Sequence, residues 1–76
     1  MTLNEAFAKI IKTARKDADL TQEALSEKSG VSVDTISFIE RGEYLPSMNT
    51  LYAFSKAFKI PANHLIQEVD KLKPKA

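Results

Sequence analysis

Hydrophobic residues recur at intervals of three and four along most of this chain, which is the spacing of one face of an α-helix. The first such segment covers residues 3–17. Its apolar positions are Phe7, Ile10, Ile11 and Ala14. Thr2 and Glu5 have the spacing of a capping box, in which each side chain accepts a hydrogen bond from the other residue's backbone N–H group. The pattern therefore predicts an amphipathic helix over residues 3–17.

Two shorter helices follow, separated by a glycine. Thr21 and Ser32 are suitable N-caps for helices over about residues 22–29 and 33–41. Gly30 stands between the two helices and can adopt the left-handed conformation that ends a helix and turns the chain sharply. These residues predict a tight turn that keeps the two helices separate.

Two more helices complete the pattern. Ser47 is a suitable N-cap for a helix over residues 48–58. Pro61 precedes a fifth helix that runs to about Leu72, because proline is tolerated where a helix begins. Pro74 then ends all regular structure. Five short helices with short connections predict an all-α domain.

Composition narrows the classes of function. The chain has 76 residues, which is enough for one small domain. Cysteine is absent and His64 is the one histidine, so thiolate chemistry is excluded and no metal site is expected. No serine–histidine–aspartate set or glycine-rich phosphate loop can be assembled, so we expect no enzyme, no cofactor and no small-molecule ligand. No apolar run approaches the roughly 20 residues that span a bilayer. We therefore expect a cytoplasmic protein without membrane contact.

Charge alone does not identify a partner. The formal net charge is +1, which is weak evidence for nucleic-acid binding. Basic residues gather in the first helix and near the C-terminus: Lys9, Lys12, Arg15, Lys16, Lys71, Lys73 and Lys75. A solvated helix face is the commoner role of such clusters.

The stretch from Thr21 to Gly42 carries the functional signal. A short helix, a turn with a glycine and a second helix are the parts of a helix-turn-helix motif. In that motif the second helix projects its outer face into the major groove of DNA. A helix is about 10–12 Å across and the groove is about 12 Å wide, so the two fit.

The local sequence makes this interpretation more specific. Residues 20–32 read LTQEALSEKSGVS and residues 35–42 read TISFIERG. Both segments closely resemble the Xre/Cro/CI-type helix-turn-helix family of transcriptional regulators. Residues 45–51, LPSMNTL, resemble the loop and the start of the fourth helix in that family. The resemblance extends from about residue 5 to about residue 68.

The resemblance implies a compact five-helix, lambda-repressor-like DNA-binding domain over residues 1–72, followed by a basic disordered tail at 73–76. The implied function is that of a sequence-specific transcriptional regulator, such as a repressor, whose partner is a double-stranded DNA operator. The alternative is a helical protein-interaction module with the same fold that does not bind DNA. The acidic residues of the third helix favour that alternative.

The resemblance also implies roles for single residues. Gln22 matches a glutamine that contacts the DNA backbone and supports the third helix. Arg15 and Glu40 match a pair that ties the first helix to the third, and a guanidinium can hold a carboxylate through two hydrogen bonds. Positions on the outer side of the third helix that face bases and nearby phosphates are Ser32, Val33, Asp34, Thr35, Ser37 and Phe38. Positions in the following loop and helix start that contact phosphates are Arg41, Tyr44, Ser47 and Asn49.

Two of these positions depart from the usual pattern of the family. Asp34 brings a negative charge towards the phosphates, and it either accepts a hydrogen bond from a cytosine N4 amine or interacts with the helix dipole. Phe38 either contacts a thymine methyl group or tilts inward and covers the core. For each residue, both alternatives are compatible with the sequence.

Few cations lie near the predicted recognition helix, since residues 32–41 hold one arginine and two carboxylates. A single domain with so few phosphate ion pairs should bind weakly, whereas a two-fold dimer doubles the contacts and matches a palindromic operator. We therefore expect a homodimer formed through Tyr52, Ile60 and Leu72. The alternatives are that Ile60 belongs to the core beside Phe58 and that Leu72 is a frayed helix end.

Overall fold

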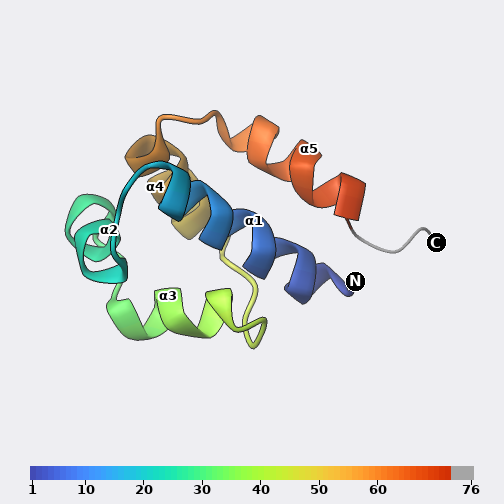
Figure 1. The fold of residues 1–76 in the computed structure, drawn as a ribbon, viewed down its shortest axis with the longest axis horizontal. Coiled ribbons are helices and arrows are strands. Elements are labelled where there is room, and N and C mark those ends of the chain that lie inside the picture. Colours follow the sequence, from blue (N-terminus) through green and yellow to red (C-terminus); the bar gives the residue numbers. More distant parts are fainter. Residues whose placement is uncertain (73–76) are drawn as a thin grey trace.

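The computed structural model describes residues 1–72, and five helices form this part of the chain (Figure 1). They are α1 (Leu3–Asp17), α2 (Gln22–Ser29), α3 (Val33–Glu40), α4 (Met48–Phe58) and α5 (Ala62–Leu72). No strand occurs among residues 1–72. The predicted all-α, lambda-repressor-like fold is confirmed. The basic tail predicted at 73–76 lies outside the described residues.

The first four helices begin at the N-caps that the sequence predicts. In each, a hydroxyl oxygen accepts a hydrogen bond of 3.0–3.1 Å from the backbone N–H group three residues later. The capping residues are Thr2, Thr21, Ser32 and Ser47. Such a bond satisfies an N–H group that has no partner within the helix.

The helix ends are less uniform than the starts. Gly30 ends α2 with φ = 75°, a left-handed conformation that glycine adopts without steric cost. Lys59 ends α4 in the same region, at φ = 59°, although it carries a side chain. α3 ends at Glu40, one residue before its predicted end, and Arg41 is its C-cap.

A single hydrophobic cluster connects the helices. Its buried members are Ile11, Ala14, Leu25, Ile36, Ile39, Leu51, Phe54, Phe58 and Leu65. α1 packs against α3 and α5, α2 packs against α3 and α4, and α4 packs against α5. Figure 1 shows α3 along one margin of the molecule, below α1 and beside α2. This packing buries one side of α3 and leaves the other side in solvent.

Candidate nucleic-acid interface

The two sides of α3 differ in burial. Ile36 and Ile39 are almost completely buried in the core. The opposite side carries the residues that the sequence assigns to DNA: Ser32 and Asp34 are exposed, and Val33, Thr35, Ser37 and Phe38 are partly exposed. The helix therefore presents a row of short polar and apolar side chains to solvent, while two isoleucines hold it against the domain.

The start of α3 is ordered by a pair of hydroxyl groups. Ser32 Oγ accepts a hydrogen bond from the backbone N–H of Thr35 at 3.1 Å. The Ser32 hydroxyl also donates to Thr35 Oγ1 at 2.9 Å. Thr35 keeps its own hydroxyl proton for an external acceptor, because it acts as the acceptor in this pair. Thr35 is thus positioned to donate a hydrogen bond into the space that α3 faces.

A polar network fixes the orientation of α3. Arg15 donates from Nε to Glu40 Oε2 at 2.7 Å and from Nη2 to Glu40 Oε1 at 2.9 Å. Its Nη1 donates to the backbone carbonyl of Leu20 at 2.8 Å. The Arg15 and Glu40 side chains are only 11% and 3% exposed, so the pair is shielded from water. The Glu40 carboxylate raises the pKa of Arg15 above its usual value, mainly through these hydrogen bonds.

Gln22 joins the same network. Its side-chain nitrogen donates to Glu40 Oε1 at 3.2 Å, which links the first residue of α2 to the last residue of α3. The resemblance implied that this glutamine supports the third helix and contacts the DNA backbone. The structure contains the support, because Glu40 now connects α3 to both α1 and α2. The resemblance did not identify Glu40 as the group that Gln22 contacts.

The C-terminal end of α3 carries an exposed aromatic and charged cluster. The rings of Phe38 and Tyr44 lie 5.0 Å apart between centroids, with 42° between their planes. The Arg41 guanidinium lies 5.0 Å from the centre of the Phe38 ring and forms an ion pair of 2.7 Å with Glu43. Phe38 is thus on the outer side, where neighbours fix its ring. Sequence reasoning did not include Glu43.

The other predicted phosphate contacts lie where α4 begins. Ser47 caps α4 and also donates its hydroxyl hydrogen to Thr50 Oγ1 at 3.0 Å. Ser47 and Asn49 are both exposed, and Tyr44 is 57% exposed. Asn49 also lines a hollow of about 280 Å³ between α2 and α4, together with Lys28 and Tyr52. Asn49 thus lies beside α2 as well as at the start of α4.

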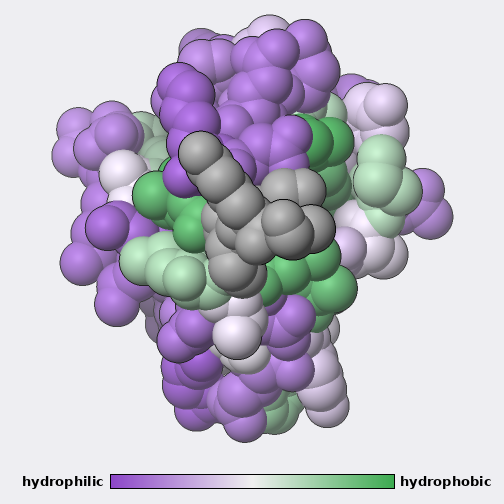
Figure 2. Space-filling model, turned by 90° about the vertical axis from the view of Figure 1, so that its right-hand side faces the viewer, coloured by the Kyte–Doolittle hydropathy of each residue, from purple (hydrophilic) through white to green (hydrophobic). Residues whose placement is uncertain are grey.

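The three predicted dimer residues do not form one patch. Tyr52 is 56% exposed and lines the hollow between α2 and α4. Ile60 and Leu72 line a different hollow, of about 360 Å³, between α1 and α5. Ile60 is also packed against the core, as the alternative held. Figure 2 shows hydrophobic surface at the end of the molecule where α1 begins and α5 ends.

Other kinds of site find no support in the described part of the chain. Among residues 1–72, no group of three histidine, cysteine or carboxylate side chains could hold a metal ion. None of the helices in this part is long and apolar enough to cross a membrane.

A five-helix domain that presents an outward helix after a glycine turn belongs to the class of helix-turn-helix DNA-binding proteins. The family model for helix-turn-helix, HTH_3, matches residues 11–65. The chain belongs to this family, the Xre/Cro/CI-type helix-turn-helix regulators. The members of the family are transcriptional regulators, so the domain is a DNA-binding module and not an enzyme.

Named relatives agree with this assignment. The immunity repressor protein of Bacillus phage phi105 is 38% identical over 63 residues, which are 83% of this chain and 44% of the repressor. The chain therefore matches less than half of that relative. An uncharacterized HTH-type transcriptional regulator of Archaeoglobus fulgidus is 40% identical over 48 residues, which are 63% of this chain and 68% of that protein.

Solved structures show the same fold. The clp gene regulator ClgR from C. glutamicum has a TM-score of 0.86 at 25% identity, and the match covers 100% of this chain and 99% of that one. A mutant of the restriction-modification controller protein C.Esp1396I has a TM-score of 0.82 at 25% identity. That match covers 93% of this chain and 92% of the controller protein.

Proposed function

We propose that this protein is a sequence-specific transcriptional regulator that binds a palindromic operator as a homodimer, with α3 in the major groove. The observation that carries the proposal is the bidentate Arg15–Glu40 pair, extended by Gln22. A helix that reads bases must enter the groove at a constant angle. The buried pair and the Ile36 and Ile39 side chains hold α3 at one angle while its outer side stays free.

The outer side of α3 offers the chemistry of base recognition. The hydroxyl groups of Thr35 and Ser37 can donate to or accept from base edges, and Asp34 can accept from a cytosine N4 amine. Val33 and Phe38 can contact a thymine methyl group. Since the Phe38 ring is already held by neighbouring side chains, this contact would need little ordering on binding.

Contacts to phosphates are proposed for the residues around α3. Neutral side chains and backbone N–H groups at helix starts are common phosphate ligands. The proposed contacts come from Gln22, Arg41, Tyr44, Ser47 and Asn49. Ser47 lies at the N-terminus of α4, and the first N–H groups of a helix have no partner within the helix.

A dimer fits the modest charge of each domain. Two copies related by a two-fold axis would place their α3 helices in successive major grooves, about 34–36 Å apart. Residues proposed for an interface in the C-terminal third are Tyr52, Ile60 and Leu72, and Ile66 of α5 is also exposed. A cytoplasmic location is proposed with this function, because the operator would be chromosomal or phage DNA.

Selection of bound duplexes from a random pool tests the proposal. We expect a palindromic consensus, and Thr35→Ala should cost about 1–3 kcal/mol of discrimination at one position of each half-site. Thr50→Ala is the matched control, because Thr50 has the same hydroxyl bond to the N-cap of its helix. The control should lose similar stability and keep the base preference.

Two outcomes would contradict the proposal. Equal loss of affinity for operator and random DNA in Thr35→Ala would mean that this residue does not read bases. Failure of the wild-type chain to bind any duplex at low salt would favour the protein-interaction module instead, because even nonspecific binding is strong there. Asp34 and Glu43, two exposed carboxylates near the outer side of α3, are the observation in favour of that second function.

A further inference from the structure

The DNA-facing side of the helix-turn-helix has little positive charge of its own. Arg41 is the one cation within α3 and its C-cap, and its guanidinium is paired with Glu43 at 2.7 Å. Asp34 adds a carboxylate in the first turn of α3, and it forms no ion pair with another side chain of residues 1–72. Glu40 is neutralised by Arg15. An operator-binding surface needs cations near phosphates, and these must come from outside α3.

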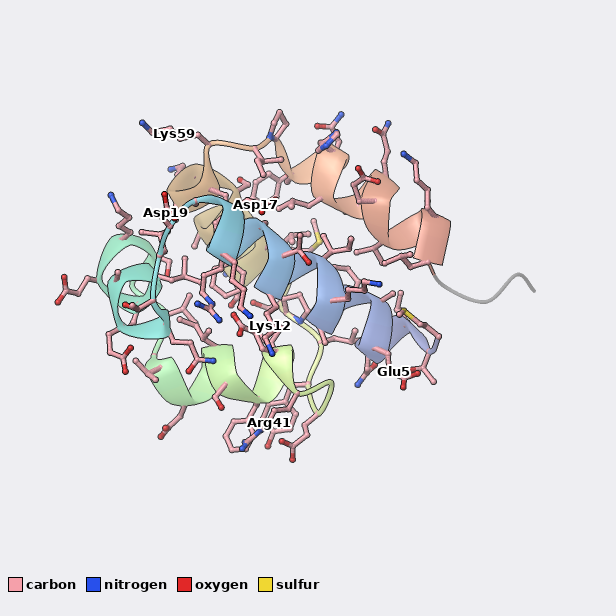
Figure 3. All side chains as sticks on the ribbon, in the orientation of Figure 1. Glu5, Lys12, Asp17, Asp19, Arg41 and Lys59 are labelled. Atoms are coloured by element: carbon pink, nitrogen blue, oxygen red, sulfur yellow. The ribbon has the colours of Figure 1, made fainter. Side chains whose placement is uncertain are left out.

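Lys12 of α1 is placed to supply such a cation. It lies three residues before Arg15, so both side chains project from neighbouring positions on one side of the helix. Arg15 points to α3 and binds Glu40, whereas Lys12 is exposed and forms no ion pair with a carboxylate of residues 1–72. Figure 3 shows Lys12 between α1 and α3. Lys9 differs, because it lines the hollow between α1 and α5.

The depth of the groove sets the height at which Lys12 would meet DNA. Packed helices have axes about 8–10 Å apart, and the major groove is about 8.5 Å deep. With α3 in the groove, α1 would lie about level with its rim, where the phosphates are. Lysine is a long, flexible side chain with a compact charge, so it can reach a phosphate from there.

We propose that Lys12 binds a DNA phosphate at the rim of the groove and provides a sequence-independent part of operator affinity. This inference rests on the proposed function of α3. Each phosphate that a lysine neutralises releases counterions, and the logarithm of the binding constant then falls with the logarithm of the salt concentration by about 0.9 per contact. The contribution of Lys12 is therefore measurable as a slope.

The test uses fluorescence anisotropy to measure the binding constants for the selected operator and for a random duplex, at salt concentrations from about 50 to 200 mM. In Lys12→Gln, the slope of the logarithm of the binding constant against the logarithm of the salt concentration should be shallower by about 0.9 for each bound domain. The variant should bind both duplexes more weakly, by the same factor. Base preference should stay unchanged. The melting temperature should also be unchanged, because the side chain is exposed. Lys12→Arg, which keeps the charge, should retain the wild-type slope.

Lys59→Gln is the charge-matched control, since Lys59 lies at the end of α4, away from α3 (Figure 3). We expect its slope to equal that of the wild type. An unchanged slope in Lys12→Gln, or an equal change in Lys59→Gln, would overturn the inference while the proposed function stands. A wild-type chain that binds neither duplex would overturn the proposed function, and this inference with it.

Discussion

The helix-turn-helix unit, α2 and α3 with the turn between them, and the C-terminal pair, α4 and α5, are oriented by different forces. α3 is tied to its neighbours by directional bonds from Arg15 and Gln22 to one carboxylate, Glu40. α5 is held through buried Leu65 and Val69. Glu68 of α5 lies 3.2 Å from Lys71 and 3.8 Å from His64, and these contacts are within the helix and largely open to solvent.

This difference fits the function that we propose for each region. Hydrophobic contact is not directional, and side chains of similar shape can replace one another in a core. A bidentate pair with a third donor tolerates far less rotation. The helix that we propose to enter the major groove, and that would need a constant orientation there, is therefore the one with the shielded polar network. The C-terminal pair keeps apolar surface at Tyr52 and Ile66, which suits association.

Among the variants that test this difference between the two regions, the one that removes Glu40 should have the largest effect on stability. Glu40→Ala leaves the Arg15 guanidinium shielded and without its carboxylate, which costs about 3–5 kcal/mol for a buried pair. In a domain of this size each kcal/mol lowers the melting temperature by roughly 4–8 °C. Operator affinity should fall as well, because α3 loses its link to α1 and α2. Thermal unfolding and anisotropy measure the two effects.

The Arg41–Glu43 pair is the control for that experiment. Its nitrogen–oxygen distance is also 2.7 Å, but its side chains are 57% and 52% exposed. Glu43→Ala should therefore cost less than about 1 kcal/mol. If Glu40→Ala and Glu43→Ala lowered the melting temperature equally, the buried network would not be what holds α3.

The second perturbation addresses the C-terminal pair. Leu72→Glu places a charge in the hollow between α1 and α5, and Tyr52→Glu places one in the hollow between α2 and α4, so at least one of them should weaken self-association. Operator affinity should then fall about tenfold or more, equivalent to about 1.4 kcal/mol. Equilibrium sedimentation at micromolar concentration measures the association. A wild-type chain that stays monomeric both free and on operator DNA would exclude the dimer.

The same pair of variants distinguishes the two faces. The three residues predicted for the interface lie in two hollows, so a single two-fold interface need not include both. If only Tyr52→Glu dissociates the dimer, the interface lies on α4. If only Leu72→Glu does, it lies along α1 and α5. Ile60 is less suitable for this purpose, because its contact with the core would make Ile60→Glu destabilising by itself.

Local features of the structure could be predicted from the sequence. The starts of α2 and α3 follow from Thr21 and Ser32, because an N-cap hydroxyl acts on an N–H group only three residues away. The end of α2 follows from Gly30, because the left-handed conformation that ends a helix is a local property of glycine. The Arg15–Glu40 pair joins residues 25 apart, and only the family resemblance suggested it.

Features that depend on the path of the chain could not be predicted. The bond from Gln22 to Glu40 spans 18 residues and needs the angle between α2 and α3. The contact of Phe38 with Tyr44 needs the course of the loop after α3. Lys59 has no local signal for a left-handed conformation, since lysine is usually found with negative φ.

The helix ends provide a third, smaller test of the comparison. Gly30→Ala should cost about 1 kcal/mol, because alanine is strained at φ = 75° although nothing lies within 4 Å of the added carbon. Lys59→Gly, at the end of α4, should instead stabilise the protein. It relieves about 1–2 kcal/mol of left-handed strain and adds chain entropy to the unfolded state, for a net gain of about 0.5–1 kcal/mol.

Chemical denaturation measures the change in the free energy of unfolding in each variant, and so shows which one is stabilised and which one is destabilised. The gain in Lys59→Gly should appear without any change in DNA affinity, since Lys59 lies at the far end of α4. The loss in Gly30→Ala should also weaken operator binding, because Gly30 sets the angle between α2 and α3. Equal DNA affinity in both variants would mean that the angle of the turn does not matter for binding.

The smallest expected effect concerns the acid dependence of helix starts. The Glu5 carboxylate accepts a hydrogen bond of 2.8 Å from the backbone N–H of Thr2. This bond, with a smaller contribution from the Thr2 side chain, lowers the pKa of Glu5 below its usual 4.5. The equivalent position at α3 is Thr35, which does not titrate in this range. Acid should therefore loosen the start of α1 and leave the cap of α3 intact.

The direction in which stability changes with pH follows from proton linkage. Because the folded state lowers the pKa of Glu5, the ionised carboxylate stabilises the protein above pH 4.5, and this contribution is lost as the pH falls through the folded pKa. Glu5→Gln keeps an acceptor for the Thr2 N–H but removes the titration. Its stability should be slightly below that of the wild type at pH 7, and the difference should shrink as the pH falls through the folded pKa of Glu5. Denaturation curves over a series of acidic pH values check this. A difference that stays constant through the acid range would mean that the charge of Glu5 plays no part in capping α1.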